Sequence, residues 1–188
     1  MDAFERVISE ILWREGYWVQ RSFKVELTKD EKVAIGRPSS PRWELDIVAY
    51  SGRRNELLVV ECKSYLDSFG VQFRAFDHTD GTLTDRFKLF NDAKLRDIVR
   101  ERLRLQLFEA GLIGEHPSVR LVLVCGKIVR EKDRKLLREH FRKNNWLLWD
   151  DEWLTDKLQA MSQGGYENSV VAVVSKLLLR GRASNRTA

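Results

Sequence analysis

Two neighbouring segments of the chain carry acidic and basic residues at a spacing that could support metal-dependent chemistry. Asp46 lies in a run rich in β-forming residues, and Glu61 and Lys63 end a second run of the same kind. The short polar stretch between the runs predicts a tight turn and therefore an antiparallel hairpin. With the turn centred between residues 53 and 54, Asp46 and Glu61 are expected to face each other across the two strands.

Side chains alternate along a strand, so Asp46, Glu61 and Lys63 are expected on one face together with Val48 and Val59. Carboxylates directly opposite one another, with β carbons about 5 Å apart, repel each other. Mg²⁺ between them would remove this repulsion and keep waters for substrate phosphates, and Mn²⁺ is expected to substitute. Lys63 would then place a positive charge near a metal-activated water, which makes phosphodiester hydrolysis the expected reaction. A solvated charge cluster held by a salt bridge explains the same three residues.

This arrangement resembles the motif of the PD-(D/E)xK phosphodiesterases, or restriction endonuclease-like nucleases, with some similarity to Holliday junction resolvase-like and Mrr-like members. That motif places an acidic residue on one strand and (D/E)-x-K on the next, matched here by Asp46 and by Glu61-Cys62-Lys63. Leu45 stands where the motif has its proline. The resemblance implies that Asp46 and Glu61 bind the ion, that the backbone carbonyl of Cys62 adds a ligand, and that Lys63 positions the attacking water.

The resemblance also implies an acidic residue on the first helix. Similar nucleases often place a metal-binding glutamate about three turns before a Gly-aromatic pair, and Glu5 precedes Gly16-Tyr17 in this way. Glu5 fits an ordinary exposed helix residue equally well, and Glu10 and Glu44 are rival acids at neighbouring positions.

Two further polar residues are candidates for contacts near this site. Helices beside the sheet of similar nucleases often supply a polar group to the site, which would give Gln106 that role. His78 follows the motif closely enough in sequence to reach a substrate. A solvated helix face and a loop surface explain Gln106 and His78 as well. No zinc-type spacing of His and Cys, phosphate-binding glycine loop or serine-nucleophile motif is present.

The periodicity of apolar residues predicts an α/β fold. The expected order is a helix ended by Gly16, a strand over 17–27, an irregular loop, the hairpin, a helix over 87–110 and a buried strand over 119–125. A basic helix over 130–143, a short strand over 146–149 and two helices over 151–161 and 167–179 follow. This order matches a restriction endonuclease-like αβββαβ core with a mixed central sheet flanked by helices, plus a C-terminal helical extension.

The predicted organisation is one domain. It comprises a nuclease-like core over 1–128, a packed β and helical extension over 129–180, and a flexible basic tail over 181–188. The first residues lack the pattern of a signal sequence, and no apolar run is long enough to cross a membrane. We therefore expect a cytoplasmic protein without a membrane partner. A homodimer through the apolar run 170–174 is one expectation, and burial of that run in the core is the other.

The chain carries 33 Lys and Arg against 28 Asp and Glu, a net charge of +5, which favours a polyanionic partner. Basic residues outnumber acidic ones between residues 120 and 143. Contacts to DNA phosphates are predicted for Arg130, Lys132, Arg134, Lys135, Arg138 and Arg142. The leading hypothesis is a metal-dependent deoxyribonuclease, more an endonuclease than an exonuclease. The alternatives are a catalytically silent nucleic-acid-binding or assembly module with a nuclease-like fold, and a structural α/β protein.

Overall fold

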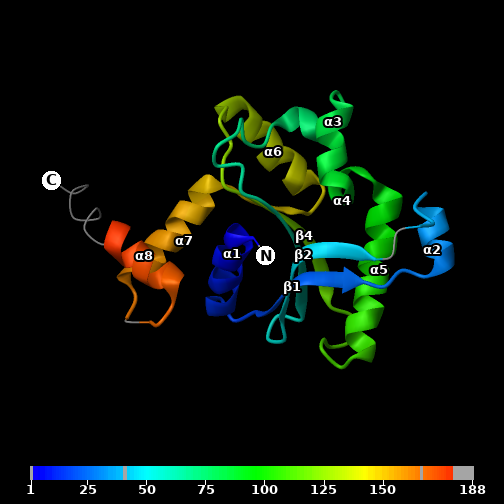
Figure 1. Cartoon of the computed structure of the whole chain (residues 1–188), viewed down its shortest axis with the longest axis horizontal. Coiled ribbons are helices and arrows are strands. Elements are labelled where there is room, and N and C mark those ends of the chain that lie inside the picture. Colours follow the sequence, from blue (N-terminus) through cyan, green and yellow to red (C-terminus); the bar gives the residue numbers. More distant parts are fainter. Residues whose placement is uncertain (1, 40–41, 166, 180–188) are drawn as a thin grey trace.

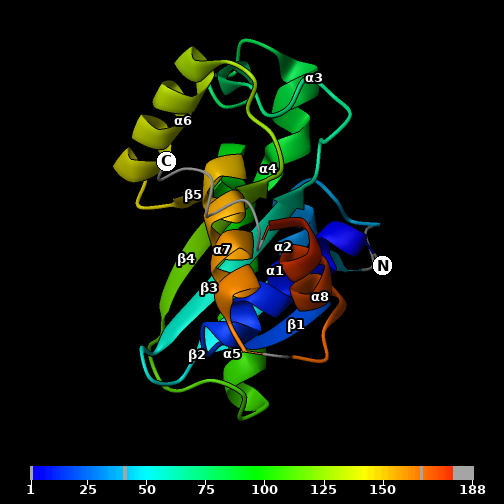
Figure 2. The same cartoon turned by 90° about the vertical axis from the view of Figure 1, so that its left-hand side faces the viewer.

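The computed structural model describes residues 2–39, 42–165 and 167–179, so the predicted basic tail 181–188 lies outside the described residues. Within these ranges, a five-stranded mixed sheet forms the centre of the protein, and helices cover both of its faces (Figures 1 and 2). The predicted α/β class and the mixed sheet flanked by helices are thereby confirmed. The strands are β1 (Trp18–Val25), β2 (Trp43–Ser51), β3 (Glu56–Lys63), β4 (Ser118–Cys125) and β5 (Leu147–Trp149).

The helices follow the predicted order with several short additions between strands. The α-helices are α1 (Ala3–Arg14), α2 (Lys29–Ala34), α3 (Gly81–Thr84), α4 (Lys88–Asn91), α5 (Ala93–Glu109), α6 (Glu131–Lys143), α7 (Asp151–Gln163) and α8 (Val170–Leu179). Two 3₁₀ turns, η1 (Phe73–Ala75) and η2 (Asp85–Phe87), lie in the long connection after β3. None of these helices combines the length and the apolar character that crossing a membrane requires.

The strands lie side by side in their order along the chain. β1, β2 and β3 pair antiparallel, whereas β4 pairs parallel to β3 and β5 pairs parallel to β4. Parallel neighbours need a crossover connection, and α5 and α6 provide the two crossovers. Because β3 and β4 are parallel, their carboxyl ends meet at one edge of the sheet, where Lys63 pairs with Cys125.

Two hydrophobic cores hold the layers together. The α1-side core joins α1 and α7 to one face of the sheet and includes Phe4, Ile8, Ile47, Ala49, Val60 and Met161. The α5-side core joins α5 and α6 to the other face and includes Leu45, Val48, Val59, Leu103, Leu123 and Phe141. Figure 1 shows the sheet between α1 on one side and α5 on the other. The sheet is thus buried on both faces, as expected for strands with nearly unbroken apolar runs.

Two local predictions are corrected by capping residues. The connection after β1 was expected to be irregular, but it contains α2, because Thr28 and Glu31 form a capping box at its start. The helix predicted over 87–110 is not continuous. Asp92 ends α4 and has extended backbone angles, and its side chain accepts a hydrogen bond from the Leu95 N–H (2.9 Å) to begin α5.

The C-terminal helices pack on the same side of the sheet as α1. The rings of Trp149 and Trp153 stack with their centroids 4.5 Å apart, and both pack against the α1-side core. On α8, Ala172 is buried, whereas Val170 and Leu177 are exposed. The apolar run of α8 is therefore only partly buried, and a dimer through it stays a prediction.

Candidate active site

The hairpin of β2 and β3 has the register that the sequence predicts. Its ladder keeps the predicted pairing up to the pair of Ile47 and Val60, which is the last one before the open end. Asp46 directly precedes Ile47 on β2, and Glu61 directly follows Val60 on β3. The two acidic residues therefore lie where β2 and β3 separate, at the edge where β3 and β4 end.

The regular alternation expected for β2 does not hold at Asp46, so the prediction that Asp46 shares one face with Val48 and Val59 is corrected. Leu45 packs in the α5-side core, but Ile47, two residues later, packs in the α1-side core. On β1, Ser22 stands between the residues paired with Leu45 and Ile47, has a φ of +48° and has no partner in the ladder with β2. The Asp46 Oδ2 atom accepts a hydrogen bond from the Cys62 N–H (2.7 Å). The Asp46 carboxylate therefore lies against the backbone of β3, at the point where the alternation of β2 side chains between the two faces is interrupted.

Glu61 and Lys63 form a close ion pair beside this position. The Lys63 Nζ atom lies 2.5 Å from Glu61 Oε1, and the two side chains are only 21% and 19% exposed. The same Nζ atom lies 6.0 Å from the ring centroid of Phe87. The lysine is thus held in a partly buried position with an aromatic ring as one wall.

Glu5 approaches the same cluster from α1. Its Oε2 atom is buried and has no hydrogen-bond partner among the described residues. Burial raises the pKa of Glu5, and the nearby Asp46 carboxylate raises it further, while Arg21 opposes the shift. A buried carboxylate oxygen without a partner is uncommon, so the Glu5 Oε2 atom is available to bind a proton, accept a hydrogen bond or bind a cation.

The electrostatics of the cluster reflect carboxylates gathered with one lysine. Burial raises the pKa values of Asp46 and Glu61, and repulsion from Asp46 raises that of Glu61 further, against the opposing effect of Lys63. For Lys63 itself, burial lowers the pKa, but attraction to Glu61 and Asp46 outweighs burial and raises it. Burial, followed by the nearby carboxylates, also raises the pKa of the Cys62 thiol. The cluster therefore favours any added positive charge.

The donor types fit a hard divalent ion, because such ions prefer carboxylate oxygens. As the side chains stand, however, no three Asp, Glu, His or Cys residues in the described part of the chain are close enough together to hold one ion. Asp46 is turned toward the Cys62 N–H and Glu61 toward Lys63. Binding would require these two carboxylates to rotate toward a common point, and the carbonyl ligand expected from Cys62 stays a prediction.

Two glycines that sequence reasoning missed build the backbone around Lys63. The Gly126 N–H donates a hydrogen bond to the Lys63 carbonyl (3.0 Å), and a side chain at Gly126 would collide with the Ser64 carbonyl oxygen. A Cβ atom at Gly70 would lie 2.6 Å from the Lys127 carbonyl oxygen. The loops that follow β3 and β4 therefore pack backbone to backbone. A signal existed, because Gly126 directly follows the buried strand β4.

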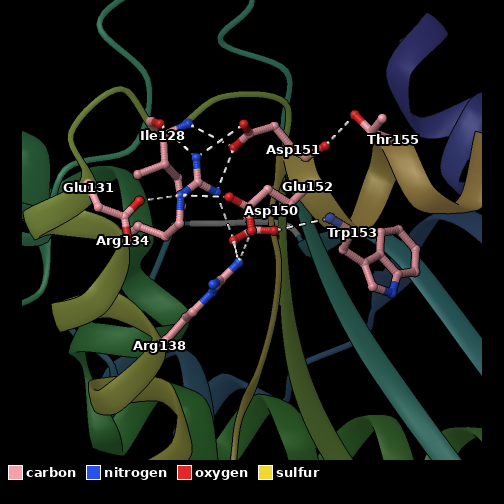
Figure 3. A network of polar contacts seen from close by, with 9 residues as sticks. All are labelled: Ile128, Glu131, Arg134, Arg138, Asp150, Asp151, Glu152, Trp153 and Thr155. Carbon is pink, nitrogen blue, oxygen red and sulfur yellow. Dashed lines mark hydrogen bonds and ion pairs between the residues drawn. The ribbon is translucent and has the colours of Figure 1, made fainter. Parts of the chain in front are cut away.

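The structure separates the six predicted phosphate-binding residues into two groups. Arg134 is only 6% exposed, and its guanidinium lies 2.8 Å from Asp150 and 3.1 Å from Asp151 and donates to the Ile128 carbonyl (Figure 3). Arg138 joins this network through Asp150 (2.6 Å). The exposed members of the set are Arg130, Lys132, Lys135, Arg138 and Arg142.

The two accessory candidates, Gln106 and His78, contact residues other than those of the acidic cluster. The Gln106 side chain accepts from the Glu26 N–H (3.1 Å) and donates to the Lys24 carbonyl (3.2 Å), so it holds the end of β1. His78 is exposed, has a φ of +61° and lines a cavity of 270 Å³ with Thr84 and other residues. Neither residue contacts the acidic cluster through a hydrogen bond that the structure describes.

Comparison with protein-family models, with curated proteins and with solved structures finds no match for this chain. Its function is therefore inferred from the residues of the site.

Proposed function

We propose that this chain is a Mg²⁺-dependent nuclease of the PD-(D/E)xK type that hydrolyses phosphodiester bonds of DNA. One observation carries the proposal: Asp46, Glu61 and Lys63 lie at the open end of the hairpin, and Glu5 lies near Asp46 with a buried oxygen that has no hydrogen-bond partner among the described residues. The succession α1, β1, β2, β3, α5, β4 supports it, because it has the αβββαβ order of that superfamily.

Each residue has a role in this proposal. Asp46 and Glu61 bind the ion, Glu5 adds an oxygen from α1, and the Cys62 carbonyl completes the set. When bound, Mg²⁺ supplies positive charge that stabilises the charge developing on the phosphate. The Lys63 ammonium orients the attacking water, because it carries three N–H donors and is held beside the carboxylates.

The second candidate is a catalytically silent nucleic-acid-binding or assembly module with the same fold. The observation that favours it is that Glu61 is engaged by Lys63 and Asp46 by the Cys62 N–H, without three acidic groups converging in the described residues. Such a module binds DNA in a salt-dependent way and does not cleave it, whichever divalent ion is present.

A cleavage assay separates the two candidates. Supercoiled, linear, single-stranded and branched DNA are incubated with Mg²⁺, Mn²⁺ or EDTA, using the wild type, Glu61→Ala and Lys63→Ala. We expect metal-dependent cleavage that falls by at least about 100-fold in both variants, as for the loss of a transition-state contact. Glu44→Ala is the matched control, because Glu44, the rival acid beside Asp46, is exposed whereas Asp46 is partly buried, and the variant should cleave normally.

The same variants give a readout that does not need activity. Mg²⁺ at about 100 times its dissociation constant should stabilise the wild type by about 2.7 kcal/mol, measured by thermal unfolding. Glu61→Ala should lose this stabilisation and Glu44→Ala should keep it. Full cleavage by Lys63→Ala would contradict the proposed role of the lysine, and salt-dependent binding without any cleavage would favour the silent module.

A further inference from the structure

The loop that follows Lys63 presents an aromatic side chain to solvent at the edge of the candidate site. Phe69 is 85% exposed, and Leu66 in the same loop is 60% exposed. A phenylalanine is normally buried because moving its apolar ring out of water is favourable. An exposed apolar residue beside a candidate catalytic site is therefore a candidate contact for a ligand.

The backbone that carries Phe69 is fixed on the neighbouring loop. The Val71 N–H donates a hydrogen bond to the Lys127 carbonyl (2.9 Å), and Gly70 forms an antiparallel bridge with Ile128. Gly70 has a φ of +69°, and an added Cβ atom would lie 2.6 Å from the Lys127 carbonyl oxygen. Phe69 is thus held outward by a defined backbone, which lowers the entropy lost when its ring contacts a partner.

Phe87 links the exposed ring to the candidate site, because it lines a small cavity with Phe69 and also lies beside Lys63. Phe69, Tyr65 and Phe87 contribute to the lining of a 190 Å³ cavity, and the Phe87 ring lies 6.0 Å from Lys63 Nζ. Arg74 and Arg86 line the same cavity. Aromatic surface with arginines beside it is the combination that proteins use to bind bases and backbone of unpaired nucleic-acid strands.

We propose that Phe69 stacks on an unpaired nucleobase next to the scissile phosphate, while Arg74 and Arg86 contact the flanking backbone. This inference rests on the proposed nuclease function and names its substrate class as DNA with unpaired bases, such as single-stranded, gapped or branched DNA. A base inside a continuous duplex is already stacked and must be displaced at a cost before it can meet the ring. An unpaired base meets Phe69 without that cost.

The test measures binding without cleavage. Phe69→Ala, the wild type and Phe108→Ala are titrated in EDTA with a gapped duplex that carries 2-aminopurine in the gap, and with the continuous duplex. Phe108 is the matched control, because it is an exposed phenylalanine at the end of α5, and the loop after α5 contacts the hairpin turn away from Lys63. Removal of the 85% exposed ring of Phe69 should not disturb folding.

We expect Phe69→Ala to bind the gapped DNA about tenfold more weakly and to lose the 2-aminopurine signal change. The slope of log K against log salt should stay the same, because no phosphate contact is removed. Phe108→Ala should bind like the wild type. Equal binding of gapped DNA by all three proteins, or an equal loss for the continuous duplex, overturns the proposal. Binding to anionic vesicles that depends on Phe69, without DNA binding, also overturns it and assigns the loop to a lipid surface.

Because the binding is read without metal, the two proposals fail separately. Phe69-dependent binding with no cleavage under any divalent ion overturns the nuclease and leaves the stacking site. If cleavage depends on Lys63 but Phe69→Ala binds gapped DNA like the wild type, the stacking site is overturned and the nuclease remains.

Discussion

Two charged clusters of this protein differ in how fully their members are paired. At the end of the hairpin, the carboxylates of Glu5, Asp46 and Glu61 accompany one lysine, and burial raises the pKa of all three acids. In the network between α6 and the start of α7, Arg134 and Arg138 share Asp150 and its acidic neighbours (Figure 3). The pKa of Asp150 is lowered there.

The contrast separates a scaffold from a candidate site. Removal of charges from water costs free energy, and the α6 network offsets this cost with opposite charges. The Arg134 Nε atom has no hydrogen-bond partner among the described residues, but it lies 3.5 Å from a Glu131 oxygen and 3.6 Å from a Glu152 oxygen. The hairpin cluster gathers like charges and leaves Glu5 Oε2 without a hydrogen-bond partner in the described structure. Stability alone does not favour such an arrangement, which is why a perturbed acidic cluster is a candidate functional site.

The largest expected effect is on stability and concerns the α6 network. Asp150→Ala should lower the free energy of unfolding by about 3–5 kcal/mol, because it leaves the buried Arg134 guanidinium without a main partner. Glu61→Gln should raise it slightly at neutral pH, because it removes a partly buried negative charge beside Asp46. Urea denaturation measures both variants. A larger loss in Glu61→Gln than in Asp150→Ala would contradict the assignment of scaffold and site.

The second expected effect is on the pH dependence of stability in EDTA. Burial raises the pKa of Asp150, but the Trp153 N–H, Arg134 and Arg138 outweigh burial and hold it below the usual value. The folded state then binds fewer protons than the unfolded state. The stabilisation is therefore present above the unfolded pKa of about 4 and is lost as the pH falls through the folded value.

Asp150→Asn should accordingly flatten the loss of stability between neutral and acid pH. Glu61 has a raised folded-state pKa, so its contribution is present below the unfolded pKa of about 4.3 and is lost as the pH rises through the folded value. Glu61→Gln should therefore gain stability relative to the wild type at neutral pH. Denaturation curves measured across this range check both signs, and parallel curves for wild type and Asp150→Asn would contradict the first.

The smallest expected effect distinguishes exposed from buried basic residues of α6. Lys132→Ala and Lys135→Ala should each weaken DNA binding evenly across sequences and reduce the magnitude of the salt slope by about 1. Arg134→Ala should instead lower the free energy of unfolding, because this arginine is buried and paired with Asp150 and Asp151. Titrations at several salt concentrations test this difference. An unchanged slope in both lysine variants would remove α6 from the DNA interface.

Much of the fold follows from local patterns in the sequence. The spacing of Phe4, Val7, Ile8, Ile11 and Leu12 predicts α1, which is observed with all of these residues buried except Val7. The apolar run of β4 predicts a strand buried on both faces, which is also observed. The break at Asp92 was missed, although Asp92 is a good capping residue, because the apolar periodicity runs across it. Local chemistry therefore decided element boundaries that periodicity alone did not.

The sequence by itself determined the hairpin and its register, because the turn length and the alternation of apolar residues leave one pairing that buries Val48 against Val59. It thereby brought Asp46 close to Glu61. Only the tertiary structure decided that the alternation of β2 side chains is interrupted at Asp46 and that Glu5 of α1 lies near Asp46. It also decided that Arg134 is buried, because Asp150, sixteen residues away, folds back onto it. Such contacts depend on how whole layers pack, which a pattern within one element does not specify.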